Sequence, residues 1–212
     1  MSDWSSSANF AVADTLYVGS TSVCRPRWFG FPSSRVSTTT TTSHFPACRF
    51  RIAATACISL IQAYPERLEL VEELAPVVTE EWGHFRMVLV ELKKRDLRLG
   101  RQRKDEYVNE LLKFQKKGVS RDEALLERLL TCALIEARSC ERFRLLSLYC
   151  ADEELRGWYH KFMVAEASHY RMFLDLAELY FDPAAVRQRW QEYLYREAHI
   201  LQEMTPRGDR MH

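Results

Sequence analysis

From about residue 50 to residue 204, apolar residues recur every three or four positions, and no stretch of useful length alternates apolar with polar residues. The first spacing places apolar side chains on one face of an α-helix, whereas alternation is typical of a half-buried strand. The pattern therefore predicts an all-α chain. Because the predicted helices are long and most of their connections are short, they favour a helical bundle.

The boundaries of the helices follow from residues that stop or start a helix. Pro65 ends the first helix, since its ring removes a backbone donor, and Pro76 marks a candidate kink in the second. Ser120 and Glu123 have the spacing of a capping box, and Pro183 suits a first helical turn. The expected helices cover residues 50–64, 66–95, 120–149, 152–180 and 183–204. We expect a polar, basic connection between the second and third helices.

The N-terminal region has a different character. Residues 1–49 are rich in Ser and Thr, with five consecutive threonines at 38–42, and three prolines interrupt any regular element. This composition predicts a mostly disordered segment, followed by the bundle (50–204) and a polar tail (205–212). A segment rich in Ser and poor in acids also suits a transit peptide, although Asp3 and Asp14 come early for one.

Composition narrows the classes of partner and compartment. The chain has 212 residues, of which 47% are hydrophobic, and this is enough for one domain with a sizeable core. A net charge of +1 gives no global attraction to nucleic acid or membrane. No apolar run has the length of a membrane span, and no secretory signal is clear. The six cysteines form no CxxC pair, so we expect reduced thiols and a cytoplasmic protein.

Two Glu-x-x-His motifs carry the candidate chemistry, Glu81 with His84 and Glu166 with His169. Positions i and i+3 share one face of a helix, so each motif directs a carboxylate and an imidazole to the same point. Both motifs lie within apolar stripes, and Glu136 lies in a similar stripe on the third helix. A buried carboxylate is costly unless it is paired or binds something. The sequence thus predicts a metal site or, alternatively, a buried acid–histidine network.

The ligand types indicate the metal. Carboxylates and imidazoles without thiolates suit iron or manganese better than a structural zinc. Two helices that contribute Glu and two that contribute Glu-x-x-His form the di-iron bundle pattern. That pattern is suited to binding and activating dioxygen.

The motifs also resemble a known family. Residues 135–143 (IEARSCERF), residues 80–84 (EEWGH) and the segment 147–169, with its DEEL and EASH stretches, closely resemble MiaE-type tRNA hydroxylases. The resemblance covers about residue 52 to the C-terminus, with the motifs in the family's order. It implies a ferritin-like four-helix bundle, here with an extra C-terminal helix. It also implies a non-haem di-iron site and hydroxylation of the isopentenyl side chain of 2-methylthio-N6-isopentenyladenosine beside the anticodon.

The resemblance further implies which partners and ligands the chain uses. Its partners would be tRNA and an electron-transfer protein, with no membrane. Its cofactors would be iron, with two atoms expected from the family and one or none possible here, together with dioxygen and an external electron donor. Carried across by motif, the metal ligands are Glu81, His84, Glu136, Glu166 and His169.

One ligand of the family pattern is missing. The family has a further Glu on the first helix, about thirty residues before the first Glu-x-x-His, where this chain has Arg49, Phe50 and Arg51. No acid occurs between Asp14 and Glu66, and Glu66 would lie roughly 22 Å from Glu81 along one helix. Either the N-terminal segment is aberrant, as after a shifted reading frame or a wrong start, or the chain is a divergent member with an impaired or one-metal site. The change in composition near residue 50 favours the first explanation.

Three further signals bear on the substrate. A basic cluster between the second and third helices suits contacts to tRNA phosphates, or is a solvated charge run. It comprises Lys93, Lys94, Arg95, Arg98, Arg101, Arg103 and Lys104. Aromatic residues that could line an alkyl pocket, or simply fill the core, are Trp82, Phe143 and Tyr170. Arg138, Glu141 and Arg142 share one helix face, which predicts pairing between helices or around the ligands, or surface ion pairs.

The leading hypothesis is therefore an oxygen-dependent tRNA hydroxylase. One alternative is a ferritin-like protein that stores iron or handles peroxide. The other is a metal-impaired or inactive family member that acts as an RNA-binding protein.

Overall fold

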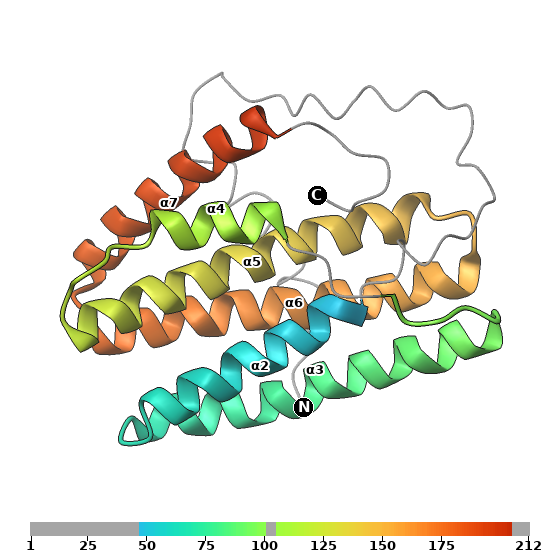
Figure 1. Ribbon diagram of the computed structural model, residues 1–212, viewed down its shortest axis with the longest axis horizontal. Helices are drawn as coiled ribbons and strands as arrows, with labels where there is room; N and C mark the ends of the chain where they lie inside the picture. The colour runs from blue at the N-terminus through green and yellow to red at the C-terminus, as the bar shows by residue number, and fades with distance from the viewer. Residues whose placement is uncertain (1–46, 101–104, 205–212) are drawn as a thin grey trace, which may run out of the picture. The chain divides into compact units, whose positions relative to one another are not determined.

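The computed structural model describes residues 47–100 and 105–204. The chain divides into two units, Met1–Thr41 and Thr42–His212, and every described residue belongs to the second. The disorder expected for the N-terminal segment and the polar tail at 205–212 lie outside the described residues. Within them all regular structure is helical, which confirms the all-α prediction (Figure 1). The helices are α2 (Ala47–Ala63), α3 (Leu68–Lys94), α4 (Glu106–Phe114), α5 (Arg121–Tyr149), α6 (Glu153–Tyr180) and α7 (Pro183–Glu203).

Four long helices form the bundle. Helix α2 packs mainly on α3 and α5 mainly on α6, and α3 contacts α6 to join the two pairs (Figure 1). Helix α7 covers the second pair through contacts with α5 and α6. A four-helix bundle with an extra C-terminal helix is therefore confirmed. None of the described helices is long and apolar enough to span a membrane.

The capping residues place the starts of the later helices. The Ser120 hydroxyl accepts from the Glu123 backbone N–H, and the Glu123 carboxylate accepts from the Ser120 N–H, so the predicted capping box is confirmed. The Asp152 and Asp182 side chains cap α6 and α7 by accepting from the backbone N–H groups of Leu155 and Ala185. Helix α2 begins at Ala47, three residues before the expected start. Helix α3 continues through Pro76.

The connection between the second and third long helices contains a helix that the sequence did not lead us to expect. Helix α4 spans Glu106–Phe114, with the Asp105 side chain accepting from the Val108 N–H as its N-cap. Tyr107 and Leu111, one turn apart, are buried against the bundle. We expected only a polar, basic connection here, and the short apolar repeat of this helix was hidden among the many cations.

A buried ionic network holds α7 to the rest of the bundle. The Arg189 guanidinium donates to both oxygens of Glu127 at 2.8 Å, and Tyr193 donates to the same carboxylate at 2.7 Å. Such a pair fixes the register of two helices, since breaking it would leave a buried charge uncompensated.

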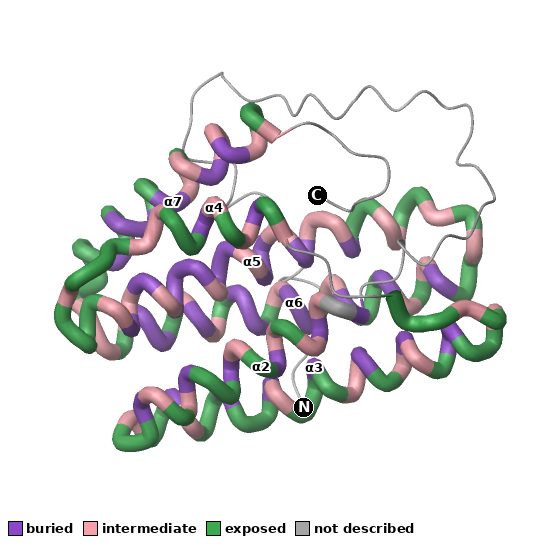
Figure 2. The backbone as a smooth tube through the Cα atoms, in the orientation of Figure 1, coloured by how far each residue is buried: buried purple, intermediate pink, exposed green. Residues whose placement is uncertain are grey.

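The apolar core at the other end of α5 and α6 adjoins the candidate site. Phe50, Phe143 and Phe162, which we call the aromatic cluster, are each about 1% exposed and come from α2, α5 and α6. The Phe50 ring centroid lies 4.8 Å from that of Phe162 and 5.8 Å from that of Phe143. Figure 2 shows how the buried segments of the helices face the interior of the bundle. The candidate ligands extend this buried interior along α3, α5 and α6.

Candidate metal centre

Helix α3 directs Glu81 and His84 into the bundle. Glu81 is fully buried, and its Oε1 lies 3.8 Å from Nδ1 of His84, one turn further along the helix. The same Oε1 lies 3.2 Å from Nδ1 of His169 on α6. Both imidazoles therefore turn Nδ1 toward one carboxylate. The i, i+3 spacing predicts this for His84, whereas the approach of His169 depends on the packing of α6 on α3.

Helices α5 and α6 supply the second part of the site. Glu136, Glu166 and His169 are each at most 5% exposed, and each offers a ligand atom that lies within 4.8 Å of the others. The structure thus brings all five predicted ligands together from three helices. That they bind metal remains a prediction.

The donor atoms fit a metal because several of them are buried without a well-aligned hydrogen-bond partner among the described residues. They are both carboxylate oxygens of Glu81, Nδ1 of His84, Oε2 of Glu166 and Nδ1 of His169. Buried polar atoms in this state cost free energy unless they bind something. Oxygen and imidazole nitrogen donors with this geometry suit iron or manganese.

The pKa values of these groups describe the metal-free protein. Burial raises the pKa of Glu136, and it raises that of Glu166 well above its usual range, with the neighbouring Glu136 charge adding to the effect. Burial also opposes ionisation of Glu81, but the neighbouring His169 and His84 imidazoles outweigh it, so the pKa of Glu81 is lowered. Although burial disfavours its charge, contacts with Glu81, Glu136 and Glu80 raise the pKa of His169 to about 9. A metal would thus take the place of protons held at these sites.

Glu80 is a functional candidate that the sequence did not single out. Nε2 of His169 donates to Oε2 of Glu80 at 3.1 Å, across the interface of α3 and α6. A carboxylate on one imidazole nitrogen fixes the ring and its tautomer, so that the other nitrogen faces the metal. Glu80 is half exposed and 89 residues from its partner, and its only sequence signal is its place beside Glu81.

Replacing Glu80 by glutamine (Glu80→Gln) should weaken divalent-metal binding about tenfold, because the amide keeps the shape but loses the charge that orients His169. Titration of the metal-free protein with Co²⁺, followed by visible absorption, measures this. Glu72→Gln, an exposed change on the same helix, serves as the control and should leave the affinity unchanged. Equal affinities for the Glu80 and Glu72 variants would rule out the positioning role.

On α2, the three residues at the place of the family's first-helix Glu behave differently. Phe50 is buried, and its ring centroid lies 5.1 Å from that of His84. Arg49 donates to the Ser139 hydroxyl on α5, and its positive charge favours ionisation of Glu136 and Glu166. No described residue of α2 is an acid. Helix α2 therefore brings a hydrocarbon ring and a cation to the site.

Charged residues that follow Glu136 on α5 form ion pairs with other helices. Nε and Nη2 of Arg138 donate to Oε1 of Glu197 on α7 at 3.0 and 2.9 Å, and Arg138 also pairs with Glu141. Tyr107 of α4 donates to the same Glu197 oxygen at 2.6 Å. This network connects α4, α5 and α7, as the prediction of pairing between helices required.

The basic cluster is split by its contacts. Lys94 lies 3.3 Å from Glu91 and 3.5 Å from Glu154, and Arg95 pairs with Glu91 and Asp152 at 2.6 Å. Lys93 and Arg98 are exposed. The other three members of the cluster, Arg101, Arg103 and Lys104, lie outside the described residues. Lys93 and Arg98 are therefore the described members best placed to contact phosphates.

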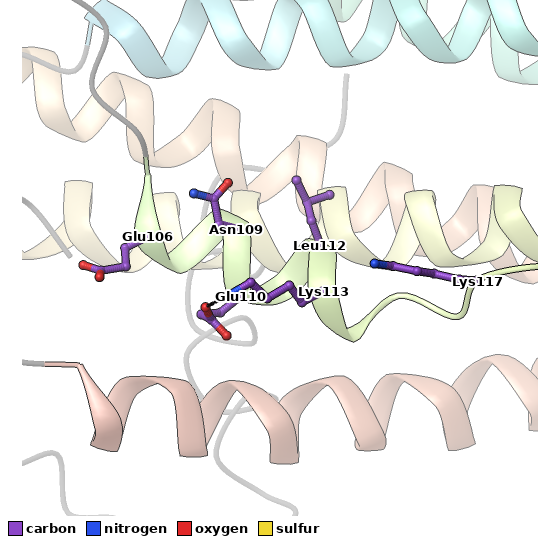
Figure 3. A pocket seen from close by; sticks show the side chains of 6 residues that line it. All are labelled: Glu106, Asn109, Glu110, Leu112, Lys113 and Lys117. Atoms are coloured by element: carbon purple, nitrogen blue, oxygen red, sulfur yellow. Dashed lines mark hydrogen bonds and ion pairs between the residues drawn. The ribbon is translucent and has the colours of Figure 1, made fainter.

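The three aromatic residues proposed for an alkyl pocket lie in different surroundings. Phe143 belongs to the aromatic cluster beside His84, whereas Tyr170 packs on Trp190 of α7. Trp82 is 48% exposed and packs on Phe85. A surface pocket, shown in Figure 3, lies elsewhere, on α4. Its lining, which includes none of the candidate ligands, consists of Glu106, Asn109, Glu110, Leu112, Lys113 and Lys117.

Comparison with known proteins gives consistent matches. A family model described as tRNA-(MS[2]IO[6]A)-hydroxylase (MiaE) matches residues 37–212, a range that includes α2. A relative from Pseudomonas putida named tRNA 2-(methylsulfanyl)-N(6)-isopentenyladenosine(37) hydroxylase is 36% identical over 139 residues, which are 66% of each chain. A Salmonella typhimurium relative of the same name is 31% identical over 110 residues, or 52% of this chain and 40% of the relative. The matched region thus spans no more than about two thirds of these relatives.

A solved structure resembles the fold. It is described as protein 43 with aldehyde deformylating oxygenase activity from Synechococcus. The TM-score is 0.74 at 30% sequence identity, over 79% of this chain and 84% of that chain. The likeness supports the ferritin-like assignment of the bundle.

Proposed function

Since the chain belongs to the MiaE family of tRNA hydroxylases, we propose that it hydroxylates the isopentenyl side chain of 2-methylthio-N6-isopentenyladenosine in tRNA. The observation that carries the proposal is the convergence of three buried carboxylates and two imidazoles from α3, α5 and α6. The names of the curated relatives specify the same nucleoside.

The proposed cofactor is iron, held by Glu81, His84, Glu136, Glu166 and His169. Iron bound there would supply dioxygen activation, with electrons from an external donor that we propose is a partner protein. The residues of the chain would hold the ligands in place. Glu80 orients His169, and because burial raises the pKa of Glu136 and Glu166, metal binding would displace protons from these carboxyl groups.

The aromatic cluster is suited to an alkyl substrate. Its Phe50 and Phe162 rings lie 5.1 and 4.9 Å from the His84 ring, so a hydrocarbon wall borders the ligand set. Such a wall excludes water and offers the isopentenyl group an apolar surface beside the metal. We propose that this end of the site receives the side chain.

Recognition of tRNA would use the exposed groups on α3 and after it. Lys93 and Arg98 are placed for phosphate contacts, which carry most of the salt-dependent affinity. Trp82 adjoins Glu81 in the chain and leaves about half its surface exposed, so its ring can stack on a base turned out toward the site.

Three other functions can be compared with the first. The Synechococcus neighbour makes an aldehyde-processing oxygenase the second candidate on the same bundle. Because Arg49 and Phe50 stand where the family has a first-helix Glu, a metal-impaired family member that binds RNA is the third candidate. A ferritin-like role in iron or peroxide handling would need no tRNA, and the family match argues against it.

A direct assay separates these functions. Iron-loaded protein is supplied with reductant and air, together with isopentenylated tRNA, the free nucleoside or a long-chain aldehyde, and the products are identified by mass spectrometry. We expect hydroxylated nucleoside from tRNA and no alkane from the aldehyde. Alkane formation without nucleoside hydroxylation would replace the proposal with the second candidate, and tRNA binding without either product would favour the third.

A further inference from the structure

The candidate ligands divide unequally into two halves. Glu136, Glu166 and His169 form a group of three whose ligand atoms lie within 4.8 Å of one another. Glu81 and His84 form the other half, 3.8 Å apart on one helix, and the same Glu81 oxygen borders the first half, at 3.2 Å from Nδ1 of His169. In residues 47–100 and 105–204, no further acid, His or Cys completes a second group of three around that pair. One half therefore has the ligands for a metal ion, and the other lacks at least one.

Phe50 closes the incomplete half. It comes from α2 and lies against one side of the His84 ring, at 5.1 Å between centroids, while Phe162 lies against the ring at 4.9 Å. Phe50 is 1% exposed, so its ring lies inside the bundle and places carbon atoms beside His84. A hydrocarbon ring therefore lies beside His84, at the place in the chain where the family's first-helix Glu is expected.

The charge of the buried groups also suits a single ion. Glu81, Glu136 and Glu166 carry three negative charges when ionised, and Arg49 contributes one positive charge that acts on Glu136 and Glu166, which leaves −2 among these buried side chains. Half-exposed Glu80 beside His169 adds one negative charge at the edge of the site, so one divalent ion offsets most of the total. A second would leave an excess positive charge in a buried site, which is costly.

We propose that this chain binds one divalent metal ion tightly, at Glu136, Glu166 and His169, and that the Glu81–His84 half binds a second ion only weakly. The inference rests on the metal site put forward under the proposed function, and it assigns that site an unequal occupancy. Phe50 and Arg49 are the residues that make the metal affinities of the two halves unequal.

Metal titration of the metal-free protein tests this without tRNA or dioxygen. Co²⁺ binding is followed by visible absorption, and bound metal is counted after equilibrium dialysis. We expect about one tightly bound equivalent per chain. His169→Ala should weaken this binding more than about a hundredfold, whereas His84→Ala should change it less than about threefold. Two equivalents of equal affinity, or equal losses in the two histidine variants, would overturn the proposal.

Phe50→Glu adds the converse test, because it places a carboxylate beside His84. We expect a second tightly bound equivalent in this variant and none in Phe50→Leu, which keeps the site apolar. A folded Phe50→Glu protein that still binds a single equivalent contradicts the role of Phe50. Should that variant fail to fold, the two histidine variants still decide the proposal. Failure of tRNA hydroxylation would leave all of these titrations unaffected, so the two claims fail separately.

Discussion

Glu166→Gln is expected to abolish tRNA hydroxylation and metal binding while making the metal-free protein more stable. Glu166 is 2% exposed and lies beside Glu136, so its charge is both buried and repelled. Glutamine keeps the shape and the hydrogen-bonding capacity but cannot ionise, and it is a poor metal ligand. Because the substitution removes the cost of burying an ionisable acid, it should raise the free energy of unfolding by about 1–3 kcal/mol at neutral pH.

The sign of the pH dependence makes this prediction specific. Burial raises the pKa of Glu166 in the folded protein, so folding at neutral pH either keeps a proton on the acid or buries its charge. Below the pKa of the unfolded chain, near 4.5, the acid is protonated in both states. The stabilisation by glutamine should therefore be largest at neutral pH and vanish in acid.

Urea unfolding in the presence of a chelator measures the effect. Glu153→Gln is the matched control on the same helix, since its side chain is 88% exposed and its ion pair with Arg156 lies at the surface. A Glu166→Gln protein that is less stable than the wild type at neutral pH, or that still hydroxylates tRNA, would be incompatible with a buried ligand role.

Reversing the charges of Lys93 and Arg98 together (Lys93→Glu with Arg98→Glu) should weaken tRNA binding about a hundredfold at low salt. Both side chains are exposed, whereas the neighbouring Lys94 and Arg95 are engaged in ion pairs. Each reversal removes a phosphate contact and adds a repulsion, and the difference from wild type should shrink as salt screens it. Fluorescence anisotropy with labelled tRNA across a salt series provides the measurement.

The matched control changes the net charge equally on another surface. Lys161→Glu with Arg187→Glu alters exposed residues of α6 and α7, and it should reduce binding by no more than about threefold. If both double variants weaken binding to the same extent, net charge alone explains the effect, and the surface near the end of α3 is not the tRNA contact.

Much of the fold could be predicted because it depends on local signals. The capping box at Ser120, the stop at Pro65 and the start at Pro183 act within a few residues, and they placed the helices within about three residues of their ends. Helix α4 could not be recognised, since its two buried residues, Tyr107 and Leu111, gain their importance from packing against the rest of the bundle.

The candidate site could likewise be predicted only where it depends on local signals. The spacing of Glu81 with His84, and of Glu166 with His169, predicted that each pair shares a helix face, and the structure has this geometry. The pairing of His169 with Glu80, and the position of Phe50 against His84, depend on how α2 and α6 align with α3. Helix periodicity says which face a residue occupies, but contacts between helices depend on packing register.

The central claim is that the buried carboxylate–histidine cluster hydroxylates a tRNA nucleoside with dioxygen. A reaction of iron-loaded protein with reductant and isopentenylated tRNA under ¹⁸O₂, followed by mass spectrometry of the nucleosides, tests it most directly. We predict one labelled oxygen atom in the isopentenyl side chain, formed by the wild type and not by Glu136→Gln. Absence of the hydroxylated nucleoside from the iron-loaded wild type, or equal product from the variant, would contradict the account.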